Sequence, residues 1–297
     1  METHSFAVAQ ATRLLERLAF QINGVVHSPR PEAIHDLRVA IRRFAQALSA
    51  CKGCFPARPV RKIRRRLKLV MTLAGEVRDM DVALHFVAAA GVRPLEARLH
   101  ARRKQMVKTL VAVLKHWSAR KSFSKWRNAL ESELPTPEFR RVKAEAFAHR
   151  EMPRLAARFF REGARAASAG ASVAERHRFR LAAKKFRYTL ELFAGFYGPA
   201  ALSWIAQVKE LQSLLGAITD CRTVRALVDS LGGDPKLDAS LKKRQRRKSL
   251  EFQRLWETRF GGGDAARQWI QALGHPPRKP VKRSATSHAT PNVALQA

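Results

Sequence analysis

The chain has 297 residues, of which 57 are Lys or Arg and 24 are Asp or Glu, giving a formal net charge of +33 at pH 7. Such an excess excludes the balanced surface of an ordinary cytosolic enzyme and indicates a polyanionic partner. Hydrophobic residues still make up 46% of the chain, which is enough to form a core and excludes a disordered basic tail protein.

Amphipathic helices are predicted along almost the whole chain. Apolar residues recur at spacings of three and four, and no stretch shows the alternation of a β-strand. Gly and Pro residues mark most of the expected helix ends. The helices are expected at residues 5–23, 31–50, 58–89, 94–130, 137–167, 173–195, 199–230 and 235–272. The predicted fold class is therefore all-α.

The remaining segments indicate the compartment. Residues 275–297 are rich in Pro, Ser, Thr, Lys and Arg without an aromatic residue, and are expected to form a disordered basic tail. Three cysteines are too few for a disulfide framework and fit a reducing environment. No signal peptide is visible, and the pair Gly198-Pro199 interrupts the longest uncharged stretch, at residues 192–208. We therefore expect no membrane segment and a cytoplasmic protein.

The sequence contains an internal repeat. The segment from His35 to Leu48 aligns with that from His177 to Leu190 at a nearly constant offset that continues downstream. The further matched pairs are Lys68 with Lys209, Gly75 with Gly216, Asp79 with Asp220, and Pro94 with Pro235. We therefore predict two tandem copies of one helical unit, residues 1–134 and residues 135–274.

The repeated helix presents a row of polar and basic side chains on one face. The row consists of His35, Arg38, Arg42 and Gln46 in the first copy and of His177, Arg180, Lys184 and Tyr188 in the second. Donors one turn apart are separated by about 5 to 6 Å, which suits successive phosphates of an extended polymer better than one isolated anion. A cationic stripe on a single helix is usually a solvated face, but its recurrence in both copies favours a binding role.

The next helix of each copy extends this pattern. Arg65 and Lys68 share a face with Gly75 and Asp79 in the first copy. Gly75 leaves space beside the basic residues, as a close helix approach or an open channel would require. Asp79 could pair with a basic side chain of the neighbouring helix and hold it extended toward an anion. Gly216 and Asp220 hold the corresponding positions of the second copy.

These motifs resemble those of the CHAD domain, an all-helical family named for its conserved histidines. The matching pieces are His35-x-x-Arg38-Val39-x-x-Arg42-Arg43, Arg78-Asp79-Met80-Asp81-Val82, His177-x-x-Arg180-x-x-x-Lys184-x-x-Arg187-Tyr188 and Lys209-x-x-Gln212-x-x-x-Gly216-x-x-x-Asp220. The resemblance covers about residues 5–272. It implies one CHAD domain at residues 1–274, built from two helical bundles related by a pseudo-two-fold axis, with a shared basic central cleft that binds inorganic polyphosphate.

The resemblance and the basic faces together give the expected binding residues. They are His35, Arg38, Arg42, Arg43, Arg65, Lys68, Arg102, Arg103, His177, Arg180, Lys184, Arg187, Tyr188, Lys209 and Lys243. The family further implies recruitment to polyphosphate granules. From the spacing of the cysteines and histidines we expect no metal site, and we expect no cofactor. The triphosphate-processing CYTH domain that often accompanies it has no signature here. Two departures, Arg30 before Pro31 and Ala183 on a core face, concern helix stability rather than anion binding.

Other interpretations remain open. The run Lys242–Lys248 should line the cleft in part and face solvent in part, and with the net charge it is also typical of a non-specific nucleic-acid binder, although no exposed aromatic ladder is visible for stacking bases. Cys51 and Cys54 have the spacing of a redox dithiol or half a zinc site, but no second pair exists. An enzyme would be a polyphosphate hydrolase or a phosphohistidine carrier using His35 or His177. Because no defensible nucleophile or base is present, non-catalytic binding is favoured.

Overall fold

The computed structural model describes residues 1–131, 139 and 141–275, and these residues form helices and no β-strand. The first set of helices is α1 (Thr3–His27), α2 (Pro31–Ala50), α3 (Ala57–Ala89), α4 (Arg93–Ala119) and α5 (Ser122–Glu131). The second set is α7 (Ala144–Ala167), α8 (Val173–Phe193), α9 (Pro199–Asp229), α10 (Pro235–Arg259) and α11 (Ala265–Gly274). Short 3₁₀ turns lie at Lys52–Cys54 and Ala194–Phe196. The predicted all-α class is confirmed.

Two of the expected helices are in fact two helices each. The segment 94–130 divides into α4 and α5 at Lys121, whose φ of 50° lies in the left-handed region. No Gly or Pro marks that turn. The segment 235–272 divides into α10 and α11 around Gly261–Gly263, a breaker that was present in the sequence. The expected start of the second repeat at residue 135, the expected helix start at residue 137, and the expected tail from residue 276 onward lie outside the described residues.

The ends of α8 and α10 show why these segments begin where they do. Ser172 Oγ accepts a hydrogen bond from the Glu175 backbone N–H at 3.2 Å, and the Glu175 carboxylate accepts one from the Ser172 N–H at 2.7 Å. This capping box fixes the start of α8, the helix of the second motif. Asp234 caps α10 by accepting from the Leu237 N–H at 2.7 Å. Arg30, as its sequence suggested, gives α2 no side-chain cap.

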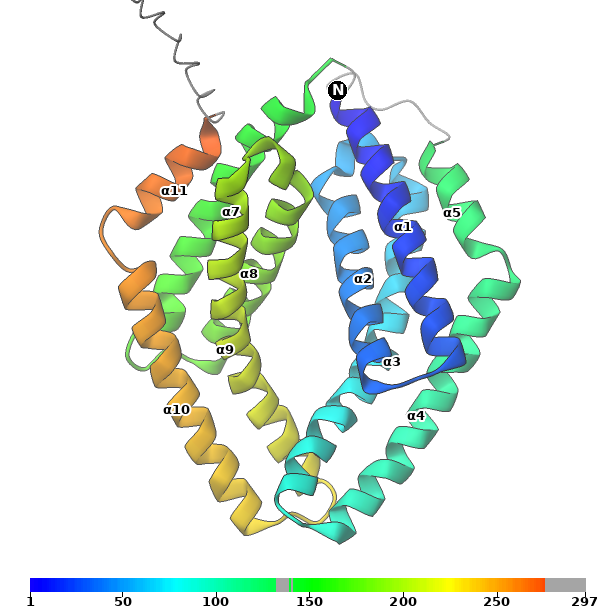
Figure 1. The fold of residues 1–297 in the computed structure, drawn as a ribbon, viewed down its shortest axis with the longest axis vertical. Helices are drawn as coiled ribbons and strands as arrows, with labels where there is room; N and C mark the ends of the chain where they lie inside the picture. The colour runs from blue at the N-terminus through cyan, green and yellow to red at the C-terminus, as the bar shows by residue number, and fades with distance from the viewer. Residues whose placement is uncertain (132–138, 140, 276–297) are drawn as a thin grey trace, which may run out of the picture.

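The order of helices α1 to α5 recurs in α7 to α11, and the two sets lie on opposite sides of the molecule (Figure 1). Helix α2 packs against α8, and α3 packs against α9. The turns from α3 into α4 and from α9 into α10 meet at the lower end of the view in Figure 1. The helices that carry the repeated motifs therefore pack against one another at the centre of the molecule.

The core has a large part and a small part. The large cluster includes a group of contacting aromatic rings, and its fully buried members include Phe159, Phe179 and Phe186. The small cluster joins α3, α4, α9 and α10 through residues such as Val87, Leu99 and Val224. At about 1.5–3 kcal/mol for each large apolar side chain, this burial offsets the repulsion of the net positive charge.

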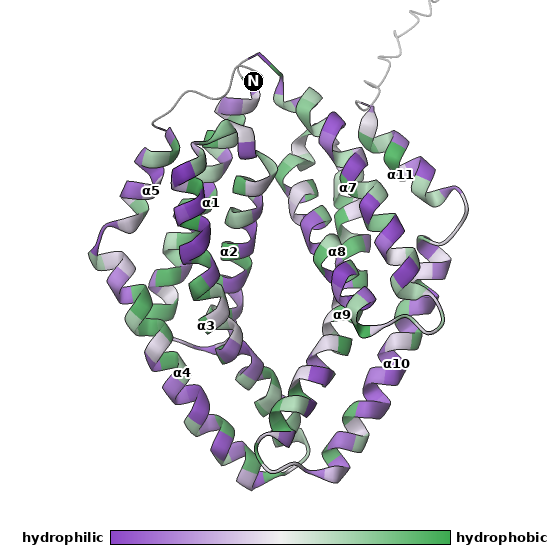
Figure 2. Ribbon diagram, turned by 180° about the vertical axis from the view of Figure 1, so that it is seen from behind, coloured by the Kyte–Doolittle hydropathy of each residue, from purple (hydrophilic) through white to green (hydrophobic). Residues whose placement is uncertain are grey.

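Polar residues cover much of α10 and the lower part of α4 (Figure 2). Most of the basic run on α10 is exposed. Among the described helices, none carries an apolar stretch long enough to span a lipid bilayer.

Candidate anion-binding site

A group of basic side chains meets where α2, α3, α8 and α9 converge. We call it the central cluster, and its members are Arg38, Arg42, Arg78, Arg180 and Lys184. Two carboxylates, Asp79 and Asp220, lie among them. The positive charges of both helix sets act on one another, because Arg42 and Arg38 of α2 both lower the pKa of Lys184 on α8. Both motif helices, α2 and α8, therefore contribute side chains to the same cluster.

The central cluster is electrostatically strained. Burial, and after it the nearby charges of Arg180, Arg42 and Arg38, together lower the pKa of Lys184 to about 7 against the opposing influence of Asp220. Burial, followed by the charge of Arg42, lowers the pKa of Arg38 to about 10. Burial also lowers the pKa of Arg180. The cluster therefore holds more positive charge than its own carboxylates neutralise.

His35 lies one turn before Arg38 on α2. Partial burial lowers the pKa of His35, and the charges of Arg78 and Arg42 lower it further, while Asp36 opposes them. The free protein thus favours the neutral imidazole at this place. A polyanion in contact with the cluster would favour the charged form.

The carboxylates of Asp79 and Asp220 partly offset the positive charge of the central cluster. Burial raises the pKa of both carboxyl groups, and Asp220 adds to the rise at Asp79 because the two are close. Arg38 acts most strongly among the basic groups on Asp79, and Arg180 does so on Asp220. The charge of each aspartate thus interacts most strongly with the basic motif helix of its own copy.

The paired glycines make room for the arginines. A Cβ atom added to Gly75 would lie 2.8 Å from Arg38 Nη1, and one added to Gly216 would lie 3.5 Å from Arg180 Nη1. Arg38 uses this space to donate from Nη1 to the Met71 carbonyl at 3.2 Å. The prediction that a glycine leaves space beside the basic residues is confirmed at Gly75, whereas at Gly216 a Cβ atom would make only an ordinary contact.

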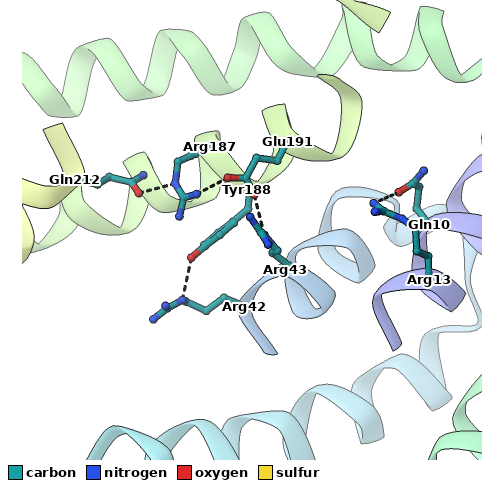
Figure 3. A network of polar contacts seen from close by, with 8 residues as sticks. All are labelled: Gln10, Arg13, Arg42, Arg43, Arg187, Tyr188, Glu191 and Gln212. Atoms are coloured by element: carbon teal, nitrogen blue, oxygen red, sulfur yellow. Dashed lines mark hydrogen bonds and ion pairs between the residues drawn. The ribbon is translucent and has the colours of Figure 1, made fainter. Parts of the chain in front are cut away.

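A hydrogen-bonded network joins α2 to α8 beside the cluster (Figure 3). Arg42 Nε donates to the Tyr188 hydroxyl at 3.0 Å, and Arg43 Nε is paired with Glu191 Oε2 at 2.9 Å. Arg187 is paired with the same Glu191, donates to Gln212 Oε1 at 2.7 Å, and stacks 4.3 Å from the Tyr188 ring centroid. Arg43 and Arg187 therefore share one carboxylate that links the two helix sets.

The CHAD domain model matches residues 9–229 of the chain, which include all of α2, α3, α8 and α9. The chain belongs to the CHAD domain family. Its fold is similar to the crystal structure of the CHAD domain from the plant Ricinus communis, with a TM-score of 0.66 and 21% identity over 93% of this chain and 94% of that one. It is also similar to PptA from Streptomyces chartreusis, with a TM-score of 0.64 and 17% identity over 86% of this chain and 100% of that one. No curated protein sequence matches the chain.

Among the other expected binding residues of this CHAD domain, some are engaged by neighbouring groups and others are exposed on their helices. Arg103 on α4 forms a 2.5 Å ion pair with the buried Asp81 and donates to the Pro29 carbonyl at 3.0 Å. It ties α4 to α3 and to the start of α2. The remaining positions are exposed on their helices, namely Arg65, Lys68, Arg102, Lys209 and Lys243. His177 lies beside a small pocket near the start of α8.

Arg78 belongs to the cluster of this CHAD domain but was not among the expected binding residues. It precedes Asp79 in the family motif, and this adjacency was the available signal. Helical-wheel grouping missed it, because Arg78 lies about 100° away from Asp79 around α3, and yet its charge acts on His35 and Arg38 of α2. Cys51 and Cys54 are buried free thiols, and the described residues include no group of three or more ligating side chains that could hold a metal ion.

Proposed function

We propose that this CHAD domain binds inorganic polyphosphate at the central cluster and does not convert it. The observation that carries the proposal is the accumulation of Arg38, Arg42, Arg180 and Lys184 in a partly buried place, where the charges of Asp79 and Asp220 offset them only in part. Burial and mutual repulsion make such a cluster unfavourable in the free protein, and a bound polyanion would relieve both.

The arrangement of the cations favours a polymer over a single anion. The rows on α2 and α8 place basic side chains one turn apart. The two rows are close enough for the charges of Arg38 and Arg42 on α2 to lower the pKa of Lys184 on α8. In the proposed complex the polymer lies in a groove between these rows, with α3 and α9 as its floor. Arginine forks bind phosphate oxygens in pairs, and Lys184 acts as a point charge.

The cellular part of the proposal follows from the family. We propose that polyphosphate binding recruits the protein to polyphosphate granules in the cytoplasm. Microscopy of a fluorescent fusion in cells with and without polyphosphate would test it, since foci that persist without the polymer contradict recruitment.

A competition assay at near-physiological salt tests the ligand. Long-chain polyphosphate and duplex DNA of equal total charge compete for the purified protein. We expect polyphosphate to win, with a log-log salt slope of about −4 to −7 if about 6 to 10 phosphates are neutralised as in a flexible single strand. Preferential binding of DNA, or a flat salt response, contradicts the proposal and favours the nucleic-acid alternative.

A second assay tests the absence of catalysis. Pure protein is incubated with polyphosphate, and released orthophosphate is measured over hours. We expect no release above that of a boiled control. Steady release that is lost on neutralising His35 or His177 contradicts a purely binding role.

A further inference from the structure

The two helix sets can be aligned by their buried residues. Helix α10 follows α4 through the pairs Leu95/Leu237, Leu99/Leu241, Leu110/Phe252 and Leu114/Trp256. Helix α9 follows α3 through Val77/Ile218, Met80/Cys221, Ala83/Val224 and Val87/Val228. In this register Gln245 corresponds to Arg103, and Arg222 corresponds to Asp81. On the motif helices, Arg176 corresponds to Ile34 just before the repeated histidine.

The corresponding places differ in charge. The first set holds the Arg103–Asp81 ion pair, in which the Asp81 side chain is 2% exposed, and its corresponding residue on the motif helix is the fully buried Ile34. The second set holds Gln245 and Arg222 instead of the pair, and Arg176 instead of the isoleucine. In the second set, Arg222 stands where the first set has the carboxylate of Asp81, and Arg176 adds a further positive charge. This part of the second set therefore has more positive charge than the first and no aspartate at the position of Asp81 to neutralise it.

The second set has a pocket of about 50 Å³ at this place. Its polar lining consists of Arg176, His177, Thr219, Arg222 and Gln245. Arg176 Nε and Gln245 Oε1 are both buried and have no hydrogen-bond partner among the described residues. Leaving a buried polar atom unpaired costs about 1–3 kcal/mol, so the pocket contains a donor and an acceptor that both lack a partner.

One chemical group satisfies both atoms and the surrounding charge. A singly protonated phosphate can accept from Arg176 Nε through a charged oxygen and donate to Gln245 Oε1 through its hydroxyl. Arg222 and His177 would contact the remaining oxygens. Near neutral pH only orthophosphate and the end groups of a linear polyphosphate carry such a hydroxyl, whereas the internal groups carry none.

The pocket adjoins the central cluster. His177 lies one turn before Arg180 on α8, and Thr219 directly precedes Asp220 on α9. A polymer that follows the basic row of α8 toward the start of that helix would therefore end beside the pocket.

We infer that the pocket between Arg176, His177, Arg222 and Gln245 holds one singly protonated phosphate group, either orthophosphate or the end group of a polyphosphate chain. The polymer part of this inference rests on the proposed function, whereas the orthophosphate part stands without it.

Isothermal titration calorimetry of the full chain with sodium orthophosphate, at constant ionic strength set by chloride, tests the pocket. Gln245→Glu supplies a built-in carboxylate next to Arg176, and Arg176→Ile copies the first helix set. Loss of a charge-assisted hydrogen bond should weaken orthophosphate binding about tenfold in each variant. Gln105→Glu, the same chemical change on an exposed face of α4, is the matched control and should bind as the wild type does.

The melting temperature separates a lost ligand site from a damaged fold. Without phosphate, Gln245→Glu should melt no lower than the wild type, because its carboxylate gives Arg176 Nε a partner. Equal orthophosphate affinity in the wild type, Gln245→Glu and Arg176→Ile overturns the inference, as does the absence of saturable binding to the wild type.

Linear tripolyphosphate and cyclic trimetaphosphate distinguish the two sources, because the ring has no end group. Weaker binding of the linear form alone in Gln245→Glu assigns the pocket to the polymer end. Unchanged binding of both, with weakened orthophosphate binding, overturns the polymer part and supports orthophosphate. Failure of long-chain polyphosphate to bind the wild type would overturn the proposed function and leave the orthophosphate result standing.

Discussion

Two basic regions of this CHAD domain, the central cluster and the run Lys242–Lys248 on α10, differ in how their charge is held. On α10, Lys242 is paired with Asp238 at 2.8 Å, and Arg247 with Glu251 at 3.6 Å. Their side chains are 53% and 64% exposed, so water and salt screen them. In the central cluster, burial and like charges lower the pKa of Lys184 to about 7.

The difference teaches that the number of cations does not define a binding site. An exposed ion pair contributes about 0–1 kcal/mol and gains little when a ligand arrives. A partly buried cluster with too few carboxylates is unfavourable until an anion enters, and its interactions are weakly screened. The same residue types are therefore screened by solvent on α10 and only weakly screened in the cluster to which we assign the proposed binding.

Removing charge from each region separately should have the largest effect. The central triple variant Arg38→Gln, Arg42→Gln, Lys184→Met should weaken polyphosphate binding by about 100-fold or more, since each lost phosphate contact is worth about 1.5–3 kcal/mol. The outer triple variant Lys243→Gln, Arg246→Gln, Arg247→Gln should cost only a few-fold. Fluorescence anisotropy with labelled polyphosphate measures both, and equal losses would remove the distinction between the regions.

The next largest effect should be proton uptake by the central cluster, and not by the α10 run, when polyphosphate binds. The unfolded chain keeps the Lys184 proton up to about pH 10, whereas the folded chain releases it near pH 7, so this residue makes the free protein more stable as the pH rises through that window. A bound polyanion restores the proton, and affinity should fall by up to about tenfold per pH unit above 7. Lys184→Arg, which stays charged, should remove this part of the dependence.

Calorimetry in two buffers of different ionisation enthalpy measures the proton uptake directly. At pH 8 we expect the wild type to take up nearly one proton more than Lys184→Arg on binding polyphosphate. Equal uptake by the two proteins would contradict the role of Lys184.

The paired glycines offer a smaller test between the two copies. Gly75→Ala places a methyl group 2.8 Å from Arg38 Nη1 and should displace that guanidinium, weakening binding about fivefold. Gly216→Ala meets Arg180 only at 3.5 Å and should leave affinity unchanged, while raising the free energy of unfolding by up to about 1 kcal/mol through helix propensity. Chemical denaturation and anisotropy together check the pair, and equal loss of affinity in both would be inconsistent with this geometry.

The smallest expected effect is that of Tyr188→Phe. It removes the hydroxyl that accepts from Arg42 Nε at 3.0 Å and keeps the ring beneath Arg187. Because one such hydrogen bond contributes about 0.5–1.5 kcal/mol, binding should weaken about threefold. Gln46→Leu, which breaks the 2.9 Å bond to Thr189 in the same helix contact without touching the cluster, is the control.

Much of the fold could be predicted from the sequence, because apolar periodicity and Gly or Pro breakers are local signals. The turn at Lys121 could not, since Ala119, Arg120 and Ser122 give no reason to leave the helix there. The glycines at 261–263 were a visible signal that the long predicted helix overlooked.

The site was predictable where the repeat revealed it. Arg38, Arg42, Arg180 and Lys184 were found from their recurring positions, and the structure brings their charges together. The engagement of Arg103 with Asp81, and of Arg187 with Glu191, depends on which helices pack together. Helical-wheel reasoning treats each helix alone and cannot show that a cation is already neutralised by a neighbour.

The two helix sets touch both at the α2–α8 contact and at the opposite end, where Arg98 Nη1 donates to the Leu231 carbonyl at 2.6 Å. Fastened at both ends, the rows of the central cluster keep their spacing before any ligand arrives, so little conformational entropy is lost on association. Encounter with a polyanion should then be fast and electrostatically steered, with rate constants that fall steeply as salt rises. Differences between polymers of different length should appear mainly in how long each stays bound.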